Sequence, residues 1–249
     1  MQDNKMPKVQ VRNLTKKFGD LLVLNDISFD VRSGEFLCIV GPTGCGKTTF
    51  LNSLTKLYQP TAGEILLDGE PVDLKKHNIA YIFQEYSTMP WLTVEENVGF
   101  GLDIKGVEKE KAKVLVNEYL DIVGLTKYRK YYPDQLSASM LQRVVIARAF
   151  ATQPDLLLMD EPYGQLDIQL RYHLEDELIS LWQRTGTTVL FITHNIEEAV
   201  YMGERILVLT NKPTSIKCAI DNNLPRPRDI ASPDFVKLRN EVTDLIKWW

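Results

Sequence analysis

Residues 36–49 read FLCIVGPTGCGKTT, an apolar run that leads directly into a glycine-rich segment. A buried strand, then a glycine-rich loop, then a helix is the order typical of a site for a nucleoside triphosphate. Glycines let successive backbone N–H groups converge on phosphate oxygens at the helix N-terminus. The plainer alternative is a glycine-rich turn before an ordinary helix, and the strand that precedes the loop argues against it.

Two side chains of this segment have the chemistry that a magnesium nucleotide requires. The Lys47 ammonium can bridge the terminal phosphates, and the Thr48 hydroxyl suits a Mg²⁺ ligand. For Cys45 two interpretations stay open, a thiol open to oxidation or a small residue that fits, and the second is favoured because nothing around it is redox-like. The predicted nucleotide-binding loop comprises Gly41, Pro42, Thr43, Gly44, Cys45, Gly46, Lys47, Thr48 and Thr49.

Composition sets further bounds on the class of protein. The 249 residues, 44% of them hydrophobic, are enough to bury a substantial core. A net charge of -4 gives no polyanion-binding signature, so nucleic acid is not a predicted partner. Three scattered cysteines indicate a reducing cytosol rather than a disulfide framework. No apolar stretch approaches the length of a bilayer span and no signal-peptide core is present, so we expect a protein that is soluble on its own.

The order of predicted elements indicates an α/β protein. We expect a P-loop NTPase core with a mainly parallel sheet, an N-terminal antiparallel β portion and an inserted helical subdomain. Residues Thr93 and Glu96 have the spacing of a capping box that starts a helix. Strands are predicted at residues 9–14, 29–31, 36–40, 64–67, 79–83, 156–159, 187–193 and 205–210, and helices at 48–56, 108–123, 139–151 and 167–184. The predicted domains are a core of residues 1–86 and 152–215, a helical subdomain of residues 87–151 and an appended tail of residues 216–249.

A second chemical centre is predicted at Asp160 and Glu161, which follow the apolar strand 156–159. Open α/β sheets bind ligands at the carboxyl ends of their strands, so these acids should serve the same crevice as the phosphate loop. Asp160 suits Mg²⁺, directly or through water. Glu161 can orient and deprotonate the water that attacks the terminal phosphate. A solvated strand end is the alternative.

Two further polar residues follow predicted strands. Gln84 comes after the strand 79–83, where its amide can contact Mg²⁺ or the attacking water. His194 comes after the strand 187–193, where an imidazole can hold the terminal phosphate and the water. Each of them alone is as easily a structural residue. With Lys47 and Glu161 they form the predicted catalytic set, and Thr48, Gln84 and Asp160 form the predicted metal set.

Taken together, these motifs resemble the ATP-binding subunit of ATP-binding-cassette transporters, from about residue 8 to residue 215. The order that carries the resemblance is the phosphate loop, Gln84, the segment 136–140 with sequence LSASM, Asp160-Glu161, Asp167 and His194. The resemblance implies that Phe18 stacks on adenine. It also implies a head-to-tail dimer that holds each ATP between one subunit's phosphate loop and the other's segment 136–140, the signature segment. Ser137, Ser139 and Asp167 join the nucleotide-binding residues on that basis.

The same resemblance predicts partners and location. Two such subunits would lie at the cytoplasmic face of the cell membrane beneath a pair of integral-membrane permease subunits, with an external solute-binding protein in the same system. Residues 85–91, with Met89 and Trp91, are predicted to couple to the permease, and local packing is the equal alternative. Residues 83–98 and 224–229 look like nitrate, sulfonate and taurine importer ATPases.

Departures from the family pattern keep other functions open. Ala138 and Ser139 stand where the family has glycines, Leu141 where it has an arginine, and Gln165 where a small residue is common. A side chain at Ser139 can hold the partner's γ-phosphate too far away, which predicts slow turnover. The alternatives are a catalytically degenerate regulatory subunit or heterodimer partner, and a P-loop kinase, which would not need Gln84, Glu161 and His194.

Overall fold

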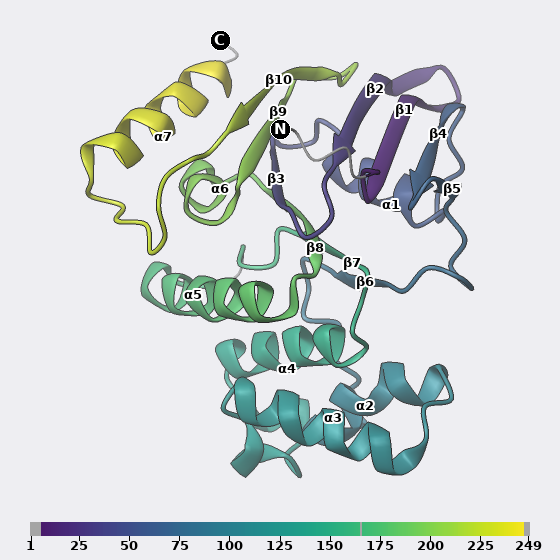
Figure 1. Ribbon diagram of the computed structural model, residues 1–249, viewed down its shortest axis with the longest axis vertical. Helices are drawn as coiled ribbons and strands as arrows, with labels where there is room; N and C mark the ends of the chain where they lie inside the picture. The colour runs from purple at the N-terminus through teal and green to yellow at the C-terminus, as the bar shows by residue number, and fades with distance from the viewer. Residues whose placement is uncertain (1–5, 165, 247–249) are drawn as a thin grey trace. The chain divides into compact units, whose positions relative to one another are not determined.

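The computed structural model describes residues 6–164 and 166–246. These residues divide into two compact units, each considered by itself (Figure 1). The first unit holds the described residues up to His77 and from Thr188 onward, and the second holds Asn78–Thr187. The second unit is therefore longer at both ends than the predicted helical segment 87–151, because it also includes two strands and a further helix. That residues 87–151 act as a subdomain stays a prediction.

An antiparallel sheet forms the N-terminal part of the first unit, as the sequence predicts. Its strand order is β2-β1-β4-β5. Alternate residues of β1, Val9 and Val11, are fully buried because successive side chains of a strand point to opposite faces. The strands are β1 (Val9–Phe18), β2 (Leu21–Val31), β4 (Ala62–Leu67) and β5 (Glu70–Pro71).

Parallel strands form the other sheet of this unit. β3 (Phe36–Val40) lies between β8 (Thr188–Thr193) and β9 (Arg205–Leu209) and pairs with both in parallel. Every residue of β3 and β8 is buried, which explains why both read as nearly continuous apolar runs. The helices of the unit are α1 (Lys47–Leu54), α6 (Ile196–Met202) and α7 (Pro233–Ile246).

Residues 216–246 differ from the predicted appended tail, because they belong to the packed structure of the first unit. β10 (Ile216–Asp221) pairs antiparallel with β9 as an edge strand. Helix α7 lies beside α6 and β9 (Figure 1) and buries Phe235 and Val242 completely. The segment reads as a tail because an edge strand alternates apolar and polar residues and its helix buries few side chains. Residues 247–249 of the predicted tail lie outside the described residues.

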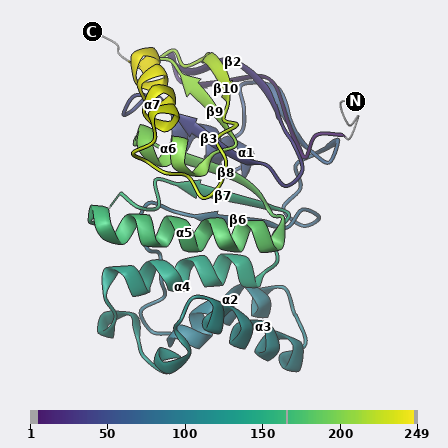
Figure 2. The same cartoon turned by 60° about the vertical axis from the view of Figure 1, so that its left-hand side comes forward.

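The described residues of the second unit form a pair of parallel strands and four α-helices. β6 (Ile79–Ile82) pairs in parallel with β7 (Leu156–Asp160). Helices α2 (Val94–Ile104), α3 (Lys109–Ile122) and α4 (Ala138–Ala151) pack on one another, and α5 (Ile168–Thr185) follows β7 (Figure 2). The predicted capping box is present at the start of α2, with Thr93 N donating to Glu96 Oε2 at 2.8 Å and Glu96 N donating to Thr93 Oγ1 at 3.4 Å.

Among the described residues, no helix combines the length and the apolar character that crossing a lipid bilayer requires.

Candidate functional site

The loop between β3 and α1 is built around the side chain of Lys47. This side chain is only 5% exposed, and its Nζ donates to the carbonyl oxygens of Gly41 at 3.0 Å and Pro42 at 3.2 Å. Cys45 N also donates to Pro42 O at 3.2 Å. The loop therefore curls around the ammonium group at the start of α1, which is the arrangement that a phosphate-binding loop needs.

Two glycines of the loop are required by its backbone. Gly46 has φ +116°, and a Cβ there would lie 2.8 Å from Val23 Cγ1, too close for any other residue. Gly44 has φ +75° but no atom within 4 Å of such a Cβ, so at this position the conformation alone demands glycine. Thr43 and Thr48 are exposed beside it. The outer part of the loop is thus open to a ligand while its inner part is packed.

A residue far along the chain anchors the loop, and motif analysis did not identify it. Thr214 is fully buried, and its hydroxyl donates to Cys45 O. Burial raises the pKa of the Cys45 thiol, and the side chain is only 2% exposed. Both facts favour the interpretation of Cys45 as a small residue that fits the loop, because a thiol with a raised pKa is less reactive.

Phe18, the predicted adenine platform, ends β1 with 41% of its surface exposed. The rings of Phe18 and Tyr58 form a T-shaped pair, with centroids 5.3 Å apart and planes at 86°. Lys16 Nζ lies 4.8 Å from the Phe18 centroid and donates to Gln59 O at 2.6 Å. These contacts hold the ring in place while leaving part of it open. The sequence analysis did not identify Tyr58 and Lys16 as neighbours of Phe18. The signal that could have indicated Tyr58 is an aromatic residue a few positions after α1.

Replacing Phe18 with alanine should weaken MgATP binding about 10-fold to 100-fold, because stacking of one base on an aromatic ring contributes about 1–3 kcal/mol. Phe18→Tyr should bind like the wild type, and Tyr58→Leu should give a smaller loss. Isothermal titration calorimetry measures these affinities.

The matched control is Leu57→Ala, which shortens a neighbouring side chain that is 68% exposed. Magnesium tripolyphosphate is the second probe, because it has no base, and Phe18→Ala should bind it as the wild type does. A Phe18→Ala protein that keeps wild-type affinity for MgATP would rule out the stacking role.

The structure brings His194 to the same sheet edge as the phosphate loop. Val40 of β3 pairs with Thr193 of β8, so Gly41 and His194 leave adjacent strands at their carboxyl ends. The His194 side chain is exposed. Its neighbours are fixed, since Thr193 Oγ1 donates to Glu198 Oε2 at 2.5 Å. The backbone on either side of His194 is therefore held firmly while the ring faces outward.

A second group of predicted residues comes together in the other unit. Ile82 of β6 pairs with Met159 of β7, so Gln84, two residues beyond β6, and Asp160, the last residue of β7, lie at the carboxyl ends of neighbouring strands. Gln84 is exposed, whereas Asp160 is only 6% exposed.

Tyr81, which sequence analysis did not single out, holds the Asp160 carboxylate. Its Oη donates to Asp160 Oδ2 at 3.4 Å. Burial and the neighbouring Asp160 charge raise the pKa of Tyr81, so the phenol keeps its proton and remains a donor. The bond orients the carboxylate without neutralising it.

Glu161 occupies an unusual backbone conformation. Its φ is +47°, in the left-handed region that residues with a side chain rarely adopt. Such strain costs about 1–3 kcal/mol and clusters at functional sites. The sharp turn after β7 thus gives Glu161 a direction that a regular strand exit would not give.

Ser137 and Asp167 both cap helices. Ser137 is the N-cap of α4, where its Oγ accepts from Met140 N at 3.4 Å and lies 3.1 Å from Ser139 Oγ. Asp167 is the N-cap of α5, and its Oδ1 accepts from Leu170 N at 3.0 Å. The signature segment therefore lies at a helix N-terminus, a position suited to an anion. Gln165 lies outside the described residues.

The donor atoms predicted for magnesium suit that ion. Thr48 supplies a hydroxyl, Gln84 an amide oxygen and Asp160 a carboxylate, all of them oxygen ligands of the kind that Mg²⁺ prefers. The exposed hydroxyl of Thr48 and the Asp160 carboxylate, oriented by Tyr81, are both compatible with that use.

Comparisons with known proteins agree with this set of motifs. The ABC transporter family profile matches residues 24–164. An uncharacterized ABC transporter ATP-binding protein of Methanocaldococcus jannaschii is 42% identical over 250 residues, covering 99% of this chain and 94% of its own. The aliphatic sulfonates import ATP-binding protein of Bacillus anthracis is 41% identical over 227 residues, covering 91% of this chain and 89% of its own.

Solved structures give the same result. The dimeric bacterial ABC transporter cassette MJ0796 matches with a TM-score of 0.75 and 31% identity over 86% of this chain and 99% of its own. The same cassette in a post-hydrolysis state with ADP and phosphate matches equally well. A cassette of the cbiONQ transporter complex from Clostridium perfringens, at 21% identity and a TM-score of 0.80, shares the fold. The predicted P-loop NTPase fold is confirmed.

Proposed function

Since this chain belongs to the ABC transporter family and is an ATP-binding-cassette ATPase, we propose that it powers the import of a small solute, with aliphatic sulfonates first among the candidates. The observation that carries the proposal is the 41% identity, over 91% of this chain, to an aliphatic sulfonates import ATP-binding protein. Taurine and nitrate are the next candidates. The solute passes through a partner, so its identity is a property of the complete transporter.

Nucleotide binding rests on the first unit. The curled loop offers backbone N–H groups to the phosphates, and the Lys47 ammonium, already inside the loop, neutralises their charge. The exposed ring of Phe18 supports the base. A ring that stacks without hydrogen-bonding to the base selects weakly among purines, so affinity comes mainly from the triphosphate.

Hydrolysis of the bound nucleotide uses polar groups that come after the strands β6, β7 and β8. Glu161 orients the attacking water and accepts its proton, Gln84 contacts that water, and the His194 imidazole holds the terminal phosphate. Thr48, Gln84 and Asp160 would hold Mg²⁺, which when bound neutralises the charge that develops on the phosphate oxygens.

A surface of the second unit supports a membrane permease as partner. Trp91 is 73% exposed and Phe83 is 48% exposed. Phe83, Met89 and Ile104 line a cavity of about 430 Å³ whose wall is mainly apolar. An exposed aromatic residue in the wall of an apolar cavity, as Phe83 is here, and a largely exposed tryptophan such as Trp91 are typical of protein interfaces. We therefore place this subunit at the cytoplasmic face of the cell membrane against permease subunits, in a system that includes an external solute-binding protein.

The side chains in the signature segment bear on how tightly two subunits can close around ATP. The two dimeric MJ0796 structures support a dimer of this chain, and we infer the head-to-tail arrangement of the family. Ala138 and Ser139, exposed or half-exposed at the start of α4, put side chains where a γ-phosphate would approach. This observation favours a second candidate, a subunit that binds ATP but depends on a related partner with an intact signature segment.

Restoring glycine at positions 138 and 139 should raise steady-state ATP hydrolysis several-fold, because the backbone could then approach the partner's phosphate more closely. The measurement is phosphate release by the purified protein. The control is Ala151→Gly at the far end of α4, which adds the same helix-weakening residue away from the nucleotide. An unchanged rate in the double variant would remove the argument for weak closure.

The import function itself is tested by deleting the gene and growing the cells on an aliphatic sulfonate, taurine or sulfate as the only sulfur source. Loss of growth on the sulfonate alone supports the proposal. Normal growth and uptake on all three would count against the assigned substrate class. Purification of the membrane complex then distinguishes a homodimer from a heterodimer with a related subunit.

A further inference from the structure

The segment Pro225-Arg226-Pro227-Arg228 supplies an unusual concentration of hydrogen bonds to one end of a short helix. Arg228 is 8% exposed although it carries a charge. Its Nη1 donates to the carbonyl oxygens of Val200 at 2.9 Å, Tyr201 at 2.8 Å and Gly203 at 2.7 Å. These carbonyls belong to the C-terminal end of α6, where an intact helix leaves its last C=O groups without partners.

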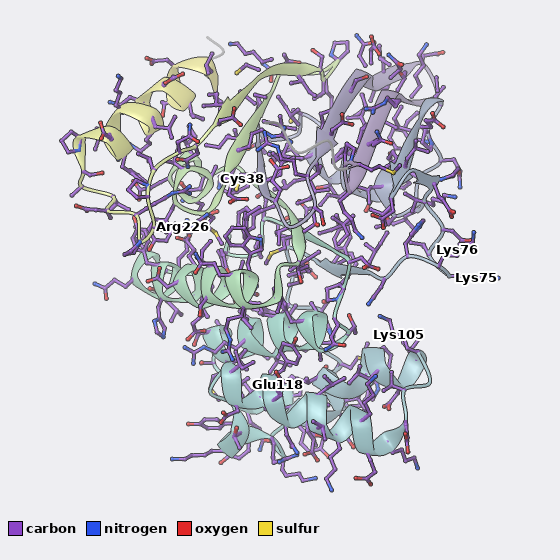
Figure 3. The ribbon with its side chains drawn as sticks, in the orientation of Figure 1. Cys38, Lys75, Lys76, Lys105, Glu118 and Arg226 are labelled. Atoms are coloured by element: carbon purple, nitrogen blue, oxygen red, sulfur yellow. The ribbon has the colours of Figure 1, made fainter. Side chains whose placement is uncertain are left out.

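Two neighbouring side chains reinforce the same end of α6. Arg226 donates from Nη1 to Tyr201 O at 3.3 Å and from Nη2 to Met202 O, and Figure 3 shows it where the chain after β10 passes α6. Asn222 Nδ2 donates to Val200 O at 2.7 Å and to Gly203 O at 3.0 Å. Positive charge at a helix C-terminus is also favourable to the helix dipole. We call Asn222, Arg226 and Arg228 the clamp.

Burial, together with the adjacent charge of Arg226, lowers the pKa of Arg228 to about 10, so the guanidinium stays protonated at neutral pH. A buried charge of this kind is tolerated because carbonyl oxygens surround it. Arg228 therefore holds the end of α6 through charge-assisted bonds over the whole physiological pH range.

The other end of α6 holds the backbone around His194. Glu198, on the first turns of α6, is 5% exposed and accepts from Thr193 Oγ1 at 2.5 Å and from Asn195 Nδ2 at 3.4 Å. Thr193 and Asn195 are the residues on either side of His194. Because α6 has only seven residues and is about 10 Å long, displacement of one end displaces the other.

We propose that Arg226 and Arg228 are positioning residues for His194, which they place by clamping the opposite end of α6. The clamp is therefore a specific link between the segment after β10 and the catalytic edge of the sheet. The inference rests on the proposed function only for the part that His194 plays in hydrolysis.

The first test observes the position of the ring directly. The chain has three histidines, His77, His173 and His194, so the imidazole signals in a two-dimensional NMR spectrum contain two internal references. Arg228→Gln should shift or broaden the His194 signals and leave the other two pairs in place. Arg32→Gln is the matched control, because its side chain is 70% exposed and its ion pair with Asp221 is long, at 3.8 Å.

The second test separates positioning from general stability. Arg228→Gln should lower kcat for ATP hydrolysis about 10-fold, within the range of an interaction that only orients a catalytic group, without changing the Kd for MgATP. His194→Ala should lower kcat further, and the double variant should be no slower than His194→Ala alone, because coupled residues are not additive. Arg228→Lys should recover part of the rate.

The outcomes distinguish the two proposals. If the wild-type protein hydrolyses no ATP, the proposed function is overturned, and the NMR result alone then decides whether Arg226 and Arg228 position His194. The positioning role of the clamp is overturned if the His194 signals do not move in folded Arg228→Gln. It is also overturned if the double variant loses the sum of the two single-variant losses in activation free energy. If Arg228→Gln does not fold, Arg226→Gln, which removes the bonds to Tyr201 and Met202 and keeps those of Arg228, is judged by the same two criteria.

Discussion

Glu161→Gln should reduce ATP hydrolysis by about 100-fold to 10,000-fold, the usual effect of removing a general base, while MgATP binding stays intact. The glutamine has the same shape, and it can still orient a water molecule but cannot accept its proton. Single-turnover phosphate release measures the rate, and calorimetry measures the affinity. A variant that hydrolyses ATP within a few-fold of the wild type would show that another residue is the base.

Glu161→Gly separates this chemistry from the strained backbone. Glycine adopts φ near +47° without cost, so this variant should be as stable as the wild type or more stable by up to about 1 kcal/mol. It should nevertheless be as inactive as Glu161→Gln. Glu64→Gln, an exposed change on β4, is the control and should alter neither activity nor stability.

Lys47→Ala should weaken MgATP binding at least 100-fold, about 2.7 kcal/mol, because it removes the charged donor inside the loop. It also leaves the Gly41 and Pro42 carbonyls without this partner, which should lower the free energy of unfolding by about 1–3 kcal/mol. Calorimetry with MgATP and thermal unfolding without nucleotide measure the two effects separately.

The control for this prediction is Lys75→Ala, which removes an exposed lysine from the same unit (Figure 3). It should change neither quantity. Wild-type affinity in folded Lys47→Ala would contradict the whole assignment of the phosphate loop, since no other lysine was predicted to contact the nucleotide.

Elements whose pattern is local were predictable from the sequence. The strands β3, β7 and β8 are continuous apolar runs because both faces are buried, and α2 begins at a capping box that is legible in four residues. The full lengths of β1 and β2 could not be predicted from the sequence. Lys16 and Lys17 interrupt the alternation, and Asn13 and Asp26 take positive φ where the register shifts.

In the candidate site, too, residues in local motifs were predictable and residues that act through distant contacts were not. Glu161 and His194 directly follow β7 and β8, Asp160 ends β7, and Lys47 begins α1 after the loop that follows β3, so their positions followed from sequence order. Tyr81, Thr214 and Arg228 act on residues or carbonyl groups distant along the chain. Such contacts leave no periodic or spaced pattern, so only the folded structure identifies them.

The bonds from Lys47 to its own loop should affect how fast and how tightly a nucleotide binds. The contacts that shape this loop come from the chain itself, so the receptor for the triphosphate is preorganised. Little conformational entropy is then lost when a nucleotide arrives, and association should approach the rate of diffusional encounter rather than wait for a slow rearrangement.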